Sequence, residues 1–91
     1  MLAELSFRPA APLPPAGASV SGDELFRQGL MYSTGLNGAP LDYVRAHMLF
    51  NLAALRGSTE AKIYRKELSA QMDAADIAEA QRAARRWLGH N

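Results

Sequence analysis

The feature that most constrains this chain is the segment YSTGLNGAPLDYVRA, residues 32–46, which separates two stretches rich in Ala, Leu, Gln, Glu and Arg. Gly35 suits the left-handed backbone position that follows a helix C-terminus, and the Asn37-Gly38 pair tolerates positive φ. Asp42 then supplies an acid for the N-terminus of a second helix. The segment therefore predicts the end of one helix, a tight turn and the start of another, which together form a helical hairpin.

The first helix of this hairpin is predicted to run from the sequence SGDE, residues 21–24, to Thr34. SGDE fits a capping box, in which the Ser21 hydroxyl accepts a bond from a backbone N–H and the Glu24 side chain reaches back to another. A helical wheel separates an inner side from an outer side. The inner side is Leu25, Phe26, Gly29, Tyr32 and Ser33, and the outer side is Glu24, Arg27, Gln28 and Met31.

The second helix, residues 41–56, is the most apolar segment of the chain and is predicted to end at Gly57. It carries two apolar faces on nearly opposite sides, and such a helix is normally sandwiched between neighbours. One face is Tyr43, Ala46, Phe50, Ala53 and Ala54, and the other is the stripe of Val44, Met48, Leu52 and Leu55. The stripe is either core, covered by the helices that follow, or an interface with a partner.

Two further helices are predicted, over residues 58–72 and 73–88. Ser58 is the predicted N-cap of the first, and Asp73 and Asp76 are acids at the start of the second. The expected inward residues are Ala61, Tyr64, Leu68 and Met72 in one helix and Ile77, Ala80, Ala84, Trp87 and Leu88 in the other. With no strand signal anywhere, the predicted fold is all-α with four helices.

The first 20 residues differ from the rest, because Pro at positions 9, 12, 14 and 15 alternates with Ala. This composition favours an extended chain and cannot fill a core. We therefore expect a disordered tail at 1–20, dispensable for folding, and a helical domain at 21–89. The tail lacks a basic segment and an unbroken apolar run, so it is a poor secretory signal, and the chain is expected to be soluble and cytoplasmic.

Composition narrows the chemistry. The chain has no Cys, which excludes disulfides and cysteine nucleophiles, and its two histidines, His47 and His90, share no helical face with a carboxylate at metal-ligand spacing. The net charge is +1, from 10 Lys and Arg against 9 Asp and Glu. Such a balance gives no field for a polyanion, and no apolar run approaches a membrane span. We expect no metal, no other cofactor, no nucleic acid and no membrane as partners.

The middle of the chain resembles the Sel-one-like repeat, a relative of the tetratricopeptide repeat. The residues that carry the resemblance are Gly29, Tyr32, Gly35, Gly38, Asp42, Arg45, Ala46, Ala53, Ala54, Gly57 and Ala61. Residues 23–61 would form one full repeat, and residues 62–88 resemble the helical tail that closes such arrays. Gln28, Ala39 and Leu49 depart from the residues common in the family. The resemblance implies antiparallel hairpins of a short superhelix, with Gly29, Ala46 and Ala53 setting the close approach of the first two helices.

The resemblance also implies a non-catalytic adaptor that binds a protein or peptide. The predicted contact residues are Arg27, Gln28, Met31, Val44, Met48, Leu52 and Leu55. One repeat is fewer than the three that solenoids usually need, so a symmetric homodimer is one way to cover the stripe. The alternative is a small-molecule or enzymatic function in a pocket lined by Tyr32, Tyr43, His47 and Tyr64.

Overall fold

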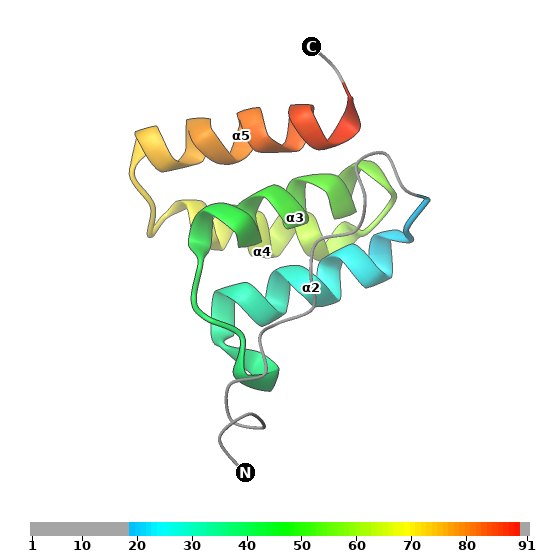
Figure 1. The fold of residues 1–91 in the computed structure, drawn as a ribbon, viewed down its shortest axis with the longest axis horizontal. Coiled ribbons are helices and arrows are strands. Elements are labelled where there is room, and N and C mark those ends of the chain that lie inside the picture. Colours follow the sequence, from blue (N-terminus) through cyan, green and yellow to red (C-terminus); the bar gives the residue numbers. More distant parts are fainter. Residues whose placement is uncertain (1–18, 90–91) are drawn as a thin grey trace, which may run out of the picture.

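The computed structural model describes residues 19–89, and all regular secondary structure in that range is helical, as predicted. The elements are α2 (Gly22–Thr34), the short 3-10 helix η1 (Leu36–Gly38), α3 (Tyr43–Leu55), α4 (Thr59–Ser69) and α5 (Ala74–Leu88). Consecutive α-helices run in opposite directions (Figure 1). Nearly all of the predicted tail, and His90, lie outside the described residues.

Three of the four helix starts are fixed by a side chain that accepts a hydrogen bond from the first turn. Ser21 Oγ accepts from the Glu24 N–H at 3.0 Å, Asp42 Oδ1 from the Arg45 N–H at 3.0 Å, and Ser58 Oγ from the Ala61 N–H at 3.2 Å. Each bond satisfies a backbone donor that the helix itself leaves free. The predicted starts of these three helices are therefore correct to within one or two residues.

One detail of the predicted caps is wrong, and another is correct in position only. The Glu24 carboxylate does not reach back to complete a capping box, because it accepts hydrogen bonds from Arg27 and Gln28 on its own helix. Asp73 does occupy the N-cap position of α5, but its side chain makes no capping bond. The start of α5 is therefore favoured by the negative charges of its first residues near the helix N-terminus, and not by a side-chain hydrogen bond.

The turn between α2 and α3 has the backbone that its residues predict. Gly35, Asn37 and Gly38 all adopt positive φ, at 78°, 59° and 78°. The Asp42 N–H donates to the Tyr32 carbonyl oxygen at 2.9 Å, which ties the end of α2 to the start of α3. The result is the predicted antiparallel hairpin, closed by a hydrogen bond across the turn.

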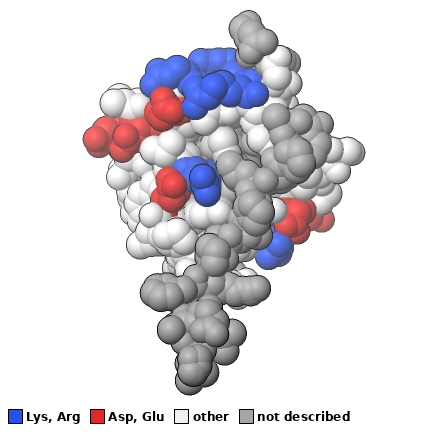
Figure 2. Space-filling model, in the orientation of Figure 1, with Lys and Arg blue, Asp and Glu red and all other residues white. Residues whose placement is uncertain are grey.

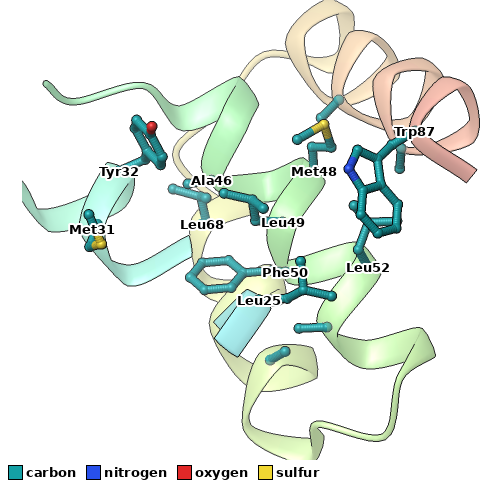
Figure 3. Packing of buried hydrophobic residues seen from close by; sticks show 14 of the residues in the cluster. Leu25, Met31, Tyr32, Ala46, Met48, Leu49, Phe50, Leu52, Leu68 and Trp87 are labelled. Atoms are coloured by element: carbon teal, nitrogen blue, oxygen red, sulfur yellow. The ribbon is translucent and has the colours of Figure 1, made fainter. Parts of the chain in front are cut away.

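Helix α3 occupies the centre of the fold and packs against α2, α4 and α5. Figure 1 shows α2 and α5 on opposite sides of α3, with α4 behind it. The largest fully buried side chains are Leu25, Leu49, Phe50 and Leu52, and three of these belong to α3 (Figure 3). The prediction that this helix is sandwiched between neighbours is confirmed.

The two helices of the hairpin approach closely at Gly29. A methyl group built there would lie 2.5 Å from Phe50 Cε1, so only glycine leaves room for the ring at this separation. Ala46 and Ala53 on α3 are both fully buried. Beyond the hairpin the expected pattern fails, because α4 and α5 each pack on α3 but make little contact with one another. The last two helices therefore do not form a second packed hairpin.

The predicted outer side of α2 is wrong for two residues. Gln28 is 7% exposed and Met31 is 4% exposed, so both lie in the interior rather than at the surface. Gln28 is three residues after Leu25 and four before Tyr32, and these spacings place it on the same helical face as those buried residues. The buried face of α2 is therefore wider than the helical wheel predicted.

Candidate binding groove

The predicted apolar stripe of α3 is mostly core. Met48 is 5% exposed and Leu52 is 1% exposed, and both face α5 and its Trp87 (Figure 3). Helix α5 approaches α3 closely because it presents the small buried residues Ala80 and Ala84. Leu52 therefore has no surface to offer a partner, and Met48 offers only a small area beside Val44, in a cavity between α3 and α5. Because α5 already covers these two residues, the stripe does not need a second copy of the chain to bury them.

The remaining predicted contact residues are scattered. Arg27 is exposed, but its guanidinium pairs with Glu24 at 2.6 Å on the same helix, and these bonds lower the pKa of the Glu24 carboxyl. Gln28 and Met31 are buried and Val44 is half-buried. Leu55 is the exception, because it is 69% exposed at the C-terminal end of α3. The structure therefore does not bring the seven predicted residues together into one surface.

The four residues of the alternative pocket have separate surroundings. Tyr32 is buried and its hydroxyl accepts a bond from Arg45 at 3.2 Å, while His47 is buried with its Nε2 2.8 Å from Ser69 Oγ. Tyr64 is 41% exposed and stacks edge-on against Phe26, with ring centroids 5.1 Å apart. The Tyr32 hydroxyl and His47 Nε2 thus bond to different neighbours, while His47 Nδ1 is buried without a hydrogen-bond partner in residues 19–89 and Tyr43 is half-buried.

A groove that the sequence did not predict opens where α4 and α5 diverge over the C-terminal half of α3. Its volume is about 480 Å³, within the range of ligand sites in proteins. The nine lining residues come from all three helices: Asn51, Ala54 and Leu55 from α3, Lys62 and Arg65 from α4, and Gln81, Ala84, Arg85 and Leu88 from α5. The groove therefore exists because α5 docks on α3 instead of on α4.

The charges that line the groove all have one sign. Lys62 and Arg65 stand on the α4 wall and Arg85 on the α5 wall, and no Asp or Glu lines it. Arg65 Nη1 donates to Asn51 Oδ1 at 2.7 Å, which fixes that guanidinium over the groove. None of the three cations forms an ion pair with a carboxylate of residues 19–89. The groove thus combines an apolar lining with unneutralised positive charge.

The neighbouring arginines of α5 behave differently. Arg82 and Arg86 bond to Glu79 at 2.8 Å and 3.2 Å, and these bonds lower the pKa of the Glu79 carboxyl. Figure 2 shows the Lys and Arg side chains gathered over α5, with acidic side chains beside them. The outer basic surface of α5 is thus partly neutralised within its own helix, whereas Arg85 in the groove is not.

Of the groove residues, only Leu55 was predicted to contact a partner. Neither Lys62 nor Arg85 is among the predicted contact residues. The signal that could have found them is the lack of an acid three or four residues from Arg85 toward its N-terminus, where Arg82 has Glu79. The absence of a nearby acid identifies an arginine without an ion-pair partner on its own helix, but it does not show which other helix faces that arginine.

Other classes of site receive no support from the described residues. In residues 19–89, no three His, Asp or Glu side chains are grouped so that they could hold a metal ion. No helix in that range is long and apolar enough to cross a membrane. Comparison of the chain with protein-family models, curated proteins and solved structures gives no match.

Proposed function

We propose that this chain is a non-catalytic protein-binding module of the adaptor type, and that the groove between α4 and α5 is its contact surface. The observation that carries the proposal is the groove itself, in which exposed Leu55 lies among three cations that lack acidic partners. An apolar surface rimmed by polar groups is the usual composition of a protein interface. Catalysis would instead need a nucleophile or general base held by a partner group, and the described lining offers only the exposed Lys62, with no His, Ser, Asp or Glu beside it.

The hairpin supports the same proposal. Gly29 of α2 packs against Phe50 of α3, and Ala46 and Ala53 of α3 are fully buried, which fits the small residues that the resemblance to a helical repeat expects at these positions. Such repeats serve as rigid supports for binding surfaces rather than as reaction sites. In this chain the hairpin would hold α3 in place as the floor of the groove.

Affinity capture tests the proposal. The full chain, immobilised at its C-terminus, should retain a protein from the native lysate in near-stoichiometric amount, as measured by quantitative mass spectrometry. A Leu55→Glu variant is the control, because Leu55 is exposed and its replacement should leave the fold intact by circular dichroism. The proposal is wrong if the wild type and this variant retain the same proteins in equal amounts.

A further inference from the structure

The groove has the chemistry to select its occupant. Resting on the proposed function above, we propose that the groove binds an acidic amphipathic α-helix of a partner protein. In this complex the apolar stripe of the helix lies on the Leu55 and Leu88 side chains. Its acidic residues pair with Lys62 on one wall and with Arg85 on the other.

Charge complementarity is the first argument. The groove wall carries cations on both sides and no acid, and none of its cations is neutralised by a carboxylate of residues 19–89. A basic segment would bring like charges together, which costs binding free energy and slows association. A segment without charge would leave the cations partly desolvated and unpaired. An acidic segment is therefore the occupant that this surface favours.

The backbone N–H and C=O groups of the bound segment need hydrogen-bond partners, and this need is the second argument. All regular structure in residues 19–89 is helical, so the groove offers no strand edge to which an extended peptide could hydrogen-bond. An extended segment would place its own N–H and C=O groups over Ala54, Leu55, Ala84 and Leu88, where they would lose water without gaining partners. A helix satisfies those groups internally and presents only side chains.

The size of the groove is the third argument. On the α5 side its lining runs from Gln81 to Leu88, eight residues of helix, and the seven steps between the first and the last correspond to a length of about 10 Å. That length matches about two turns of a bound helix and so admits apolar residues at positions i, i+4 and i+7 or i+8. Acids that flank this stripe on both sides would face α4 and α5 at once.

A matched pair of synthetic peptides tests the inference. Both are helix-forming sequences of about 16 residues with Leu at the groove-facing positions, one with Glu and the other with Lys at every flanking position. Fluorescence anisotropy with the full chain measures binding, and circular dichroism measures peptide helicity. We expect the Glu peptide to bind and to gain helicity on binding, and the Lys peptide to bind at least about tenfold more weakly.

Two double variants locate the binding site. Lys62→Glu with Arg85→Glu reverses both groove walls and should weaken binding of the Glu peptide by about tenfold or more. Arg27→Glu with Arg86→Glu makes the same change in net charge outside the groove lining, and neither position lies three or four residues from a cation of the groove. This control should change the affinity by less than about threefold. Thermal melts of both variants verify that they fold.

Several results would overturn the inference. These are equal affinity for the two peptides, no binding of the Glu peptide up to about 1 mM, an equal effect of the two double variants, or binding without a gain in helicity. Displacement of the peptide by equimolar dodecanoate would instead identify a site for small anionic amphiphiles. If capture from lysate yields a partner that the groove-reversed variant still retains, the proposed function stands and the acidic helix is wrong.

Discussion

Replacement of Gly29 by alanine tests the packing on which the hairpin depends. In an exposed helix Gly→Ala is stabilising by about 1 kcal/mol, because alanine has the higher helix propensity. In α2 the new methyl would lie 2.5 Å from Phe50 Cε1 and 2.6 Å from Cδ1. Carbon atoms in favourable contact are about 3.5 to 4.0 Å apart, so the ring would have to move by about 1 Å.

The Phe50 ring has little freedom to make that movement. It is 1% exposed, and its centroid lies 5.8 Å from that of Phe26 and 5.9 Å from that of Tyr64. Overpacking of a filled core costs about 1 to 3 kcal/mol, and a confined ring favours the upper half of that range. After subtraction of the propensity gain, Gly29→Ala should lower the free energy of unfolding by about 1 to 2 kcal/mol.

Urea denaturation followed by circular dichroism measures this change. The melting temperature should fall by about 4 to 8 °C for each kcal/mol in a domain of this size. The control is a double-mutant cycle with Phe50→Leu, because leucine lacks the ring atoms that meet the new methyl. In that background the cost of Gly29→Ala should shrink by about 1 kcal/mol or more. A Gly29→Ala variant that is more stable than the wild type would refute the reasoning.

Three further predictions concern stability. Burial and the nearby Arg65 charge hold the pKa of His47 below 6.5, so the unfolded chain binds the proton first as pH falls. The free energy of unfolding should therefore decrease below about pH 6.5, by at most about 1.4 kcal/mol per pH unit, and His47→Gln should flatten this slope in urea titrations. Asp42→Ala removes the N-cap of α3 and should cost about 1 kcal/mol in the same assay, whereas Asp42→Ser should retain most of the stability. Trp87→Ala should cost about 3 kcal/mol or more, and limited proteolysis should then cut α5 before the other helices, whereas Trp87→Phe should protect it.

The parts of the fold that sequence reasoning predicted correctly are those set by local chemistry. Ser21, Asp42 and Ser58 fix helix starts through bonds that span three residues, so their types and positions were sufficient evidence. Gly35 and Gly38 likewise adopt the positive φ that their residue type permits. Such interactions depend on neighbours in the chain and need no knowledge of the tertiary arrangement.

The errors arise where one helix meets another. Gln28 is polar and was placed outside, yet packing in the fold buries it, and its Nε2 donates to Glu24 at 2.9 Å. Leu49 was assigned to neither face of α3, although it is fully buried between neighbours. The wheel of a single helix cannot show how many neighbours surround it, and α3 has three.

The candidate site could not be predicted for a related reason. Lys62 and Arg85 are 23 positions apart in the sequence and belong to helices that make little contact, so no motif or spacing connects them. The groove forms because α5 packs against α3 and not against α4. The small side chains of Ala80 and Ala84, together with Trp87, allow α5 to pack on α3. The sequence predicted that these three residues are buried, but it did not indicate which helix covers them.

The central position of α3 has a consequence for how the molecule opens. Helices α4 and α5 are each held through α3 and only weakly through one another, so either can detach without first dislodging the other. We therefore expect the amide protons of α3 to stay protected in both partly open forms and to exchange only when the whole fold is lost. Those of α5 exchange through a smaller local opening, which also widens the groove. Helix α5 can therefore move away from α3 to admit a bulky ligand while α2 and α3 stay packed together.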